Sequence, residues 1–303
     1  MDYSVINQLP GQRLLRQIVG GLRIVLSDRS AKIYFSIIIF VLMIGIAGPW
    51  ITPYDYNEVQ REDGEILRNQ SPTLEHPLGT TTSGYDVLSR VLFGARPTVI
   101  SGILGGALII TIGMTIGLTS GYVGGQVDNI LMRFTDFIYG IPIIPFAIVL
   151  AAFFGIGYLM SILMIGLLLW RGSARVIRSQ VLQIKERPFI LAAKATGAST
   201  PRIILKHIFP NVASMAALYF ALGVGWTIII QAGLAFIGVT DPFIPSWGVM
   251  VRNAYRSGYM DVAWWWSVTP GLLIAITVLA TFMFGRTYEK LTNQSDEAVT
   301  VMG

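Results

Sequence analysis

The sequence predicts an all-α, polytopic membrane protein with six transmembrane helices. Charged residues make up only 13% of its 303 residues, whereas a soluble domain usually carries about 25%. Mean hydropathy is +0.62, and the chain contains several long runs without a charged residue. Because a helix needs roughly 20 mainly apolar residues to cross the hydrocarbon core of a bilayer, these runs indicate membrane-spanning helices. The absence of cysteine excludes disulfides and thiolate metal sites.

The spans follow from the uncharged runs, which cover residues 33–54, 97–127, 137–170, 207–240 and 262–285. The run 137–170 is long enough for the end of one helix, a glycine-containing turn and most of a second helix. The predicted spans are therefore 33–52, 97–120, 128–153, 158–177, 209–238 and 263–285. The first span has an apolar core too long for a cleavable signal peptide, and no small-residue cleavage site follows it.

The distribution of lysine and arginine predicts the orientation, since these residues concentrate in cytoplasmic loops. Six spans put both termini and every second loop on the same side of the membrane. Of the 22 lysines and arginines, 16 lie on that side and six lie in the loops on the opposite side. The predicted organisation is a cytoplasmic segment 1–32, a first helix 33–52, an extracytoplasmic loop 53–96, a core of five helices over 97–285 and a cytoplasmic tail 286–303. The core includes a cytoplasmic loop 178–208 and an extracytoplasmic loop 241–262.

Five glycines in the second predicted span lie along one helical stripe. Gly102, Gly106, Gly113, Gly117 and Gly121 are separated by four or seven residues. In lipid, helices associate through close backbone packing, and small residues four apart permit it. The stripe predicts packing within the molecule, and a mobile helix that lines a pore is the alternative interpretation.

The third predicted span carries Asp128, Arg133 and Asp136 near its start. Charges inside a membrane indicate a functional site by default, so a role in gating or substrate passage is one interpretation. The other is structural: Arg133 and Asp136 are i, i+3 neighbours near the interface, and would form an ion pair or contact a neighbouring helix. Pro142 and Pro145 predict a kink, because each removes a backbone hydrogen bond.

Aromatic residues cluster before the sixth predicted span. Aromatic side chains favour the membrane–water interface, so the cluster predicts an interfacial belt and not a ligand cage. Its members are Tyr255, Tyr259, Trp264, Trp265 and Trp266. His76, in the sequence LEHPLGT, is predicted to be an extracytoplasmic turn residue, and His207 a surface residue.

The basic segment between the fourth and fifth spans is too long for a simple turn and too basic to enter lipid. It predicts two short helices. The first, PFILAAKAT, has Pro188 in its first turn, and Gly197 supplies the C′ position at which it ends. For the second, PRIILKHIF, Thr200 is a good N-cap, Pro201 suits position N1, and Pro210 prevents continuation.

Such an amphipathic helix pair can lie on lipid or dock in a protein groove. The small residues Ala192, Ala193 and Gly197 favour close approach to a protein, since lipid binding would reward larger side chains. In the second helix, Arg202 and Lys206 share one face.

The sequence AAKATG, followed thirteen positions after its glycine by Pro210, resembles the Ala-Ala-x-x-x-Gly…Pro cytoplasmic loop of ABC importer permeases. Four further stretches resemble one branch, the dipeptide/oligopeptide/nickel-type importers, and within it the shorter, C-type permease. They are HPLGTTTSGYDVLSRVLFGAR (76–96), GYVGGQVDNILMRFTD (121–136), LAFIGVTDPFIPSWGVMV (234–251) and TPGLLIAITVLA (269–280). The chain departs from the family pattern at Thr81, Tyr85 and Leu191.

The resemblance implies the type I ABC importer permease fold and a permease subunit of an ATP-driven importer of di- or oligopeptides. It implies a second homologous permease subunit, two cytoplasmic ATP-binding subunits and an extracytoplasmic substrate-binding protein, with the chain forming half of the translocation pathway in the lipid bilayer. Oligosaccharides or nickel chelates are the alternative cargo.

In this family the loop contacts the ATPase. By position, the motif residues Ala192, Ala193, Gly197 and Pro210 are implied to couple the two proteins. The remaining candidates lie on the same helix pair and are Lys194, Ala198, Pro201, Arg202 and Lys206. For the three cations Lys194, Arg202 and Lys206, two roles are equally supported. They would contact the ATPase at the rim of the interface, or they would be solvated or bind lipid phosphates.

The chain lacks the signatures of catalysis. No Gly-Lys dipeptide occurs, so there is no Walker A phosphate loop, and ATP hydrolysis is expected in partner subunits. No enzymatic activity, cofactor, metal or nucleic acid is expected. An ATP-independent secondary transporter would show paired intramembrane charges and an inverted repeat, and a membrane protease would need an intramembrane histidine; neither pattern is found.

Overall fold

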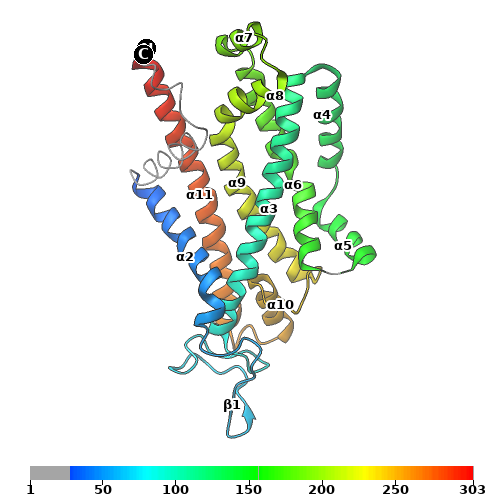
Figure 1. The fold of residues 1–303 in the computed structure, drawn as a ribbon. Coiled ribbons are helices and arrows are strands. Elements are labelled where there is room, and N and C mark those ends of the chain that lie inside the picture. Colours follow the sequence, from blue (N-terminus) through cyan, green and yellow to red (C-terminus); the bar gives the residue numbers. More distant parts are fainter. Residues whose placement is uncertain (1–27, 156, 303) are drawn as a thin grey trace.

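The computed structural model describes residues 28–155 and 157–302 and forms an elongated helical bundle (Figure 1). In this part of the chain, five helices are long and apolar enough to cross a membrane, or six if the bent pair α4 and α5 forms one span. The predicted all-α membrane fold is therefore confirmed. The bounds are α2 Arg29–Ile51, α3 Val87–Val123, α4 Gly125–Tyr139, α5 Ile143–Phe154, α6 Tyr158–Ile184, α9 Phe209–Ile237 and α11 Trp265–Met302. Of the predicted segment 1–32, residues 1–27 lie outside the described residues.

The two ends of the bundle carry different segments (Figure 1). One end holds α7 (Pro188–Ala195) and the end of α11, and we refer to it as the α7 end. The other holds α10 (Trp247–Ser257) and the loop before α3, and we refer to it as the α10 end. Successive helices run between these ends in alternate directions, as a polytopic membrane protein requires.

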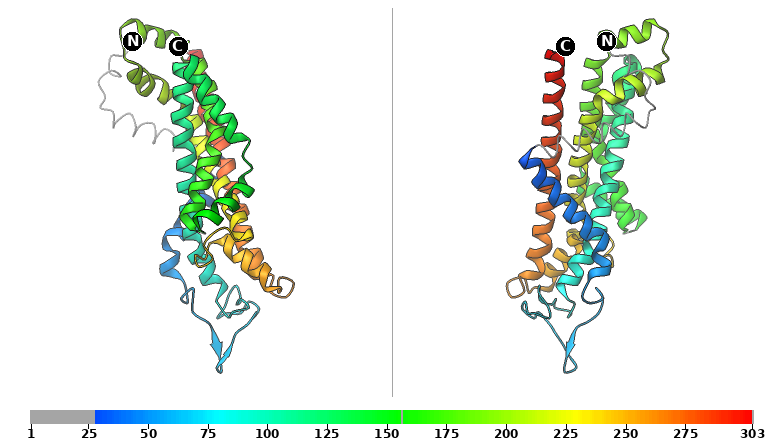
Figure 2. Two further views of the ribbon diagram at one scale, coloured as in Figure 1. Left: turned by 90° about the vertical axis from the view of Figure 1, so that its right-hand side faces the viewer. Right: turned by 60° about the vertical axis from the view of Figure 1, so that its left-hand side comes forward.

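A small β-hairpin lies at the tip of the α10 end (Figure 2). Strand β1 (Arg61–Glu62) pairs antiparallel with β2 (Glu65–Ile66), with Glu62 opposite Glu65. Asp63 and Gly64, with φ of 48° and 86°, connect the strands. Two adjacent positive φ values are those of a type I′ turn, for which Asp-Gly is a preferred sequence. This hairpin is the only sheet in the described residues; two isolated antiparallel bridges, Val59 with Tyr85 and Thr80 with Asp86, lie in the same loop.

The glycine stripe is buried between α3 and two neighbouring helices. A methyl group added at Gly106 would lie 2.8 Å from the Val224 side chain of α9, and one added at Gly113 would lie 2.0 Å from the Ser173 hydroxyl oxygen of α6. These distances are too short for any Cβ, so the helices approach closely only because the stripe has no side chains. The packing interpretation is confirmed, and the stripe does not face a pore within this chain.

Several predicted helix boundaries are wrong, and α11 continues to Met302, beyond the predicted end at residue 285. Helix α3 begins at Val87, ahead of the predicted start at residue 97, because the Asp86 carboxylate caps it by accepting the Ser89 N–H at 2.7 Å. Pro97 therefore lies inside α3. Helix α6 continues to Ile184 instead of ending at residue 177, because its last turns bury Val181 and Ile184 in an apolar cluster with α3 and α9.

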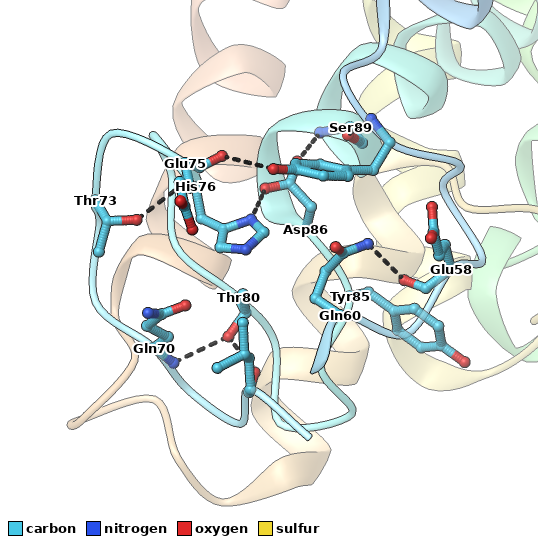
Figure 3. Close-up of polar contacts among 12 residues, drawn as sticks. Glu58, Gln60, Gln70, Thr73, Glu75, His76, Thr80, Tyr85, Asp86 and Ser89 are labelled. Atoms are coloured by element: carbon cyan, nitrogen blue, oxygen red, sulfur yellow. Dashed lines mark hydrogen bonds and ion pairs between the residues drawn. The ribbon is translucent and has the colours of Figure 1, made fainter. Parts of the chain in front are cut away.

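His76 holds the loop before α3 against the start of that helix (Figure 3). The residue is 3% exposed, and its Nδ1 lies 2.9 Å from the Asp86 carboxylate, whose other oxygen caps α3. The Thr73 hydroxyl accepts the His76 backbone N–H at 3.0 Å. His76 is in a bend, as predicted, but it is buried and supports the loop through a side-chain contact.

The predicted aromatic belt is only partly correct. Tyr255, Tyr259 and Trp264 are exposed, whereas Trp265 and Trp266 are each 6% exposed. The buried pair packs with α10 and α3, because α10 folds against the first turns of α11. The Trp265 indole also donates a hydrogen bond to the Thr80 carbonyl at 3.3 Å.

Candidate functional site

The segment between α6 and α9 begins with a short helix that has a defined start and end. Helix α7 starts at Pro188, in agreement with the prediction. Gly197 has φ of +80°; its N–H donates to the Lys194 carbonyl at 3.0 Å, and the Ala198 N–H donates to Ala193 at 3.1 Å. This pair of bonds is the Schellman motif, which satisfies the last carbonyl groups of a helix. The predicted glycine stop at residue 197 is confirmed.

The second predicted helix differs from the prediction at both ends. Ser199, not Thr200, is the N-cap of α8 (Thr200–Ile203), so Pro201 is its second residue. Helix α8 continues through a π-helical turn, η2 (Ile204–Ile208), directly into α9. Pro210 therefore does not end the helix.

The π-helical turn explains how Pro210 is accommodated. A proline within an α-helix clashes with the carbonyl four residues earlier. Here the Phe209 N–H donates to the Ile204 carbonyl five residues back, so the turn before Pro210 is wider than an α-turn. As a result, residues 200–237 form one continuous helical segment.

The helix pair α7–α8 and the adjoining turn η2 are anchored to the bundle by three isoleucines. Ile190, Ile203 and Ile208 are at most 1% exposed, and they pack with Ile177 and Val181 of α6. The buried side of the pair is therefore part of the apolar core. The pair is held in one position relative to α6 and α9, although it projects at the α7 end (Figure 1).

The outward side of the pair forms an open groove of about 430 Å³. Five of the nine predicted coupling residues line it, namely Ala192, Ala193, Gly197, Ala198 and Arg202, together with Phe189, Thr196 and His207. Lys194, Pro201, Lys206 and Pro210 are exposed but lie outside the groove. Small side chains thus leave room for groups of another molecule.

Lys194 does not extend freely into solvent. Its Nζ lies 5.2 Å from the centre of the Tyr122 ring at the end of α3, a cation–π distance. This contact ties α7 to α3 and was not predicted from the sequence. Leu191, at a position where the chain departs from the family pattern, is 49% exposed beside the groove-lining Ala192.

A second candidate region lies where α4 and α5 are broken. The sequence predicted one kinked helix over 128–153, but the two helices meet at 85° across residues 140–142. The break combines Gly140, a poor helix former, with Pro142, which has no N–H and precedes the first residue of α5. Figure 1 shows α4 entering from the α7 end and α5 turned away below it.

Arg171 of α6 compensates for this break. Its guanidinium donates to the Ile138 carbonyl at 2.6 Å. The guanidinium carbons of Arg171 and Arg175 lie 4.6 and 4.0 Å from the centre of the Tyr139 ring. In a bilayer, a carbonyl released by a helix break requires a donor. The Ile138 carbonyl accepts the Ile141 N–H at 3.2 Å, and Arg171 supplies a second donor to it.

Beside the break lies a cavity of about 330 Å³. Helices α4, α6 and α9 contribute its polar and aromatic lining, which comprises Tyr139, Arg171, Ser173, Tyr219 and Trp226. Discontinuous helices and intramembrane cations are typical of solute pathways in transporters. This site was not predicted from the sequence, in which Arg171 entered only the count of basic residues used for orientation; the available signal was an arginine at the end of the apolar run YLMSILMIGLLLW.

The acidic residues of α4 pair across to α6, and not within α4. Asp128 accepts both hydrogen bonds of a bidentate contact from Arg178 at 2.6 Å, and Asp136 pairs with Arg175. Within the part of the chain that the structure describes, Arg133 forms no ion pair. The predicted Arg133–Asp136 pair is therefore wrong, while the alternative of contact with a neighbouring helix is correct for Asp136.

Replacement of Arg171 by methionine should destabilise the α4–α6 contact by about 2 kcal/mol, since it removes the donor to Ile138 and a cation–π contact. Unfolding of the purified protein by denaturing detergent measures this change. Arg171→Lys keeps the charge and one hydrogen-bond donor, so its stability should lie between those of the unchanged protein and of the methionine variant. Equal stability of all three proteins would contradict the role given to Arg171.

Comparison with known proteins places these features in a family. Residues 109–293 match the family model described as "binding-protein-dependent transport system inner membrane component". The oligopeptide transport system permease protein OppC of Haemophilus influenzae is 32% identical over 261 residues, covering 85% of this chain and 82% of the relative. The dipeptide transport system permease protein DppC of Bacillus subtilis is 33% identical, covering 85% and 79%.

Two further matches agree. The glutathione transport system permease protein GsiD of Escherichia coli is 34% identical over 249 residues, covering 82% of this chain and 80% of the relative. The fold is similar to that of a chain in a structure of the MetNI methionine ABC transporter, with a TM-score of 0.52, 18% identity and coverage of 67% and 96%. The chain therefore belongs to the family of binding-protein-dependent transport system inner membrane components, as a membrane permease of the ABC importer class related to peptide permeases.

Proposed function

We propose that this chain forms half of the pathway of an ABC importer for di- or oligopeptides and that the helix pair α7–α8 transmits ATP-driven movement to it. It would assemble with a second homologous permease, two ATP-binding subunits at the α7 end and a substrate-binding protein at the α10 end. The observation that carries the proposal is the anchored helix pair with its outward groove of small residues. The names of the relatives favour peptides over oligosaccharides or nickel chelates.

The continuity of α8, η2 and α9 supports a mechanical role. A bound subunit shifts a conformational equilibrium only if it contacts the two states differently. Because residues 200–237 form one helical segment, a displacement at the groove would be carried along α9. Tyr219 and Trp226 of α9 line the cavity beside the α4–α5 break. Movement of the ATP-binding subunits would thereby change the shape of the cavity that the solute crosses.

The proposed orientation puts the α7 end in the cytoplasm. Most of the lysines and arginines in the described residues belong to segments at or near that end, as the positive-inside rule requires. The loop 178–208 and the tail from residue 286 share this end, whereas the loops 53–96 and 241–262 lie at the α10 end (Figure 1). Both termini would then be cytoplasmic, and both outer loops would be available to the binding protein.

Replacement of Ala192 by tryptophan should remove the ATP-binding subunits from the purified complex. Ala192 is exposed and lines the groove, so a large side chain blocks a docking partner without a clash inside this chain. The measurement is co-elution of the ATP-binding subunits with the tagged permease pair, together with ATP-dependent uptake of tri-alanine into proteoliposomes. Both should fall at least about tenfold, the effect of losing about 1.4 kcal/mol of binding free energy.

Gln126→Trp is the matched control, because Gln126 is exposed and belongs to the first turn of α4, which starts at the same end of the bundle and lies outside the helix pair (Figure 1). It should leave co-elution and uptake unchanged. Full co-elution of the Ala192 variant would refute docking at the groove. Uptake that needs no ATP would instead favour the secondary transporter.

A further inference from the structure

A cavity of about 630 Å³ opens at the α10 end between the start of α3, the end of α9 and helix α10. Three arginines line it, Arg90 from α3 and Arg252 and Arg256 from α10. Hydroxyl and amide groups complete the polar lining, supplied by Thr81, Thr82, Ser83, Asn253 and Ser257. Trp266 and Pro242 add apolar surface. The cavity is separate from the one beside the α4–α5 break and takes no part in the mechanism described above.

The three arginines have no carboxylate partner in the described part of the chain. The ion pairs there are His76–Asp86, Arg175–Asp136 and Arg178–Asp128. Asp86 is directed to His76 and to the start of α3, as Figure 3 shows. Asp241, next to the cavity-lining Pro242, accepts the Phe243 N–H at 2.9 Å. The cavity therefore carries three positive charges without a neutralising acid.

Arg252 also has an unused hydrogen-bond donor. Its Nε is fully buried and has no hydrogen-bond partner, and a buried donor without a partner costs about 1–3 kcal/mol. The guanidinium lies against Gly238 at the end of α9, where an added methyl group would be 2.7 Å from Nη2. Gly238, with φ of +97°, thus leaves the space that Arg252 occupies.

Arg90 is held in place by an aromatic ring. Its guanidinium carbon lies 4.4 Å from the centre of the Tyr85 ring, in a cation–π contact that satisfies the face of the guanidinium but not its N–H donors. The edge of the guanidinium thus stays available for hydrogen bonds. Arginine presents such donors in a planar fork that matches a carboxylate bidentately.

We propose that this cavity binds the carboxylate group of a small solute, and specifically the C-terminal carboxylate of a peptide before it enters the pathway. The identification of the solute as a peptide rests on the proposed function. Unneutralised cations in a recessed, partly apolar cavity attract an anion more strongly than an exposed site does. The volume lies within the range of small-ligand sites, about 300–1,000 Å³, and exceeds what one acidic side chain requires.

The test measures binding of tri-alanine and of tri-alanine amide to the complete importer in nanodiscs, without ATP and without the substrate-binding protein. Tri-alanine should bind saturably, and the amide, which lacks the carboxylate, at least about tenfold more weakly, as for loss of a charge-assisted hydrogen bond. Arg252→Gln and Arg256→Gln should each weaken the binding of tri-alanine about tenfold and leave the binding of the amide unchanged. A higher salt concentration should weaken the binding of tri-alanine only.

Arg68→Gln is the matched control, because it removes the same charge from an exposed position at the same end and outside the cavity. Arg252→Lys keeps the charge without the fork and should show an intermediate affinity, which separates recognition from misfolding. Equal binding of tri-alanine and its amide, or no saturable binding, overturns the carboxylate site. The carboxylate site is also overturned if the arginine variants lose only their association with the substrate-binding protein, because the arginines would then form a docking surface. Loss of the proposed function is seen separately, as wild-type uptake that does not depend on ATP.

Discussion

Replacement of Gly197 by valine is expected to reduce ATP-driven uptake about tenfold while the protein stays folded. Gly197 has φ of +80° in the Schellman turn that ends α7. An L-residue there costs about 1–2 kcal/mol, and a β-branched residue is a clear outlier in this region. A Cβ at Gly197 meets nothing within 4 Å, so the change alters the backbone of the turn and not the core. A cost of this size lowers the population of the docking geometry by a factor of about 5–30.

Gly197→Asn is the matched control. Asparagine tolerates positive φ and adds a side chain at the same exposed place, so it tests occupancy of the surface without the backbone strain. Uptake in proteoliposomes and ATPase activity stimulated by the permease should follow the order glycine, asparagine, valine. If both variants lose activity equally, the surface at residue 197 matters and the shape of the turn does not. If neither loses activity, the helix pair does not couple the two proteins.

The first helix of the pair, α7, was predictable because its signals are local. Pro188 starts α7 since its fixed φ suits a first turn, and Gly197 ends it since only a residue that accepts positive φ closes a Schellman turn. Both depend on a few neighbouring residues. The glycine stripe of α3 was predictable for a similar reason, because helical periodicity puts those residues on one face before any partner is known.

The break between α4 and α5 was not predictable from the same rules. Gly140 and Pro142 signal a weak point, but the rules allow a kink as readily as a break. The outcome also involves Arg171, which lies on another helix and adds a hydrogen bond to the Ile138 carbonyl. The π-helical turn before Pro210 is also a tertiary result, because the burial of Ile203 and Ile208 on either side keeps the segment helical through the proline.

The arginine cavity shows the same limit more strongly. Arg90 is distant in sequence from Arg252 and Arg256, and a count of basic residues records all three only as weak exceptions in the outer loops. Their common property, the lack of an acidic partner, becomes visible when α10 packs beside the start of α3 and the carboxylate of Asp86 is found engaged with His76. Such a site is defined by which contacts its members do not make, and sequence patterns carry no such information.

Replacement of Gly117 by alanine should destabilise the folded permease by about 1–3 kcal/mol, which is the cost of overpacking a closely packed interface. Gly117 lies on α3 where it crosses α6, and an added Cβ would be 2.7 Å from the Ala174 carbonyl oxygen and 2.8 Å from the Ile177 Cβ. The first of these atoms belongs to the backbone, so no side-chain rotation relieves the clash, and α3 and α6 must separate. Gly117→Val should be worse and should prevent recovery of folded protein.

The matched control is Gly233→Ala, also inside a membrane helix, where an added Cβ meets nothing within 4 Å. Alanine is about 1 kcal/mol better than glycine in a helix, so this variant should be neutral or slightly stabilised. Unfolding by denaturing detergent compares the two. Because both changes add the same methyl group, a loss confined to Gly117 measures the α3–α6 approach itself. Equal stability of the Gly117→Ala and Gly233→Ala proteins would mean that the glycine stripe is not closely packed. The positions of η2 and α9 against α3 would then need another explanation.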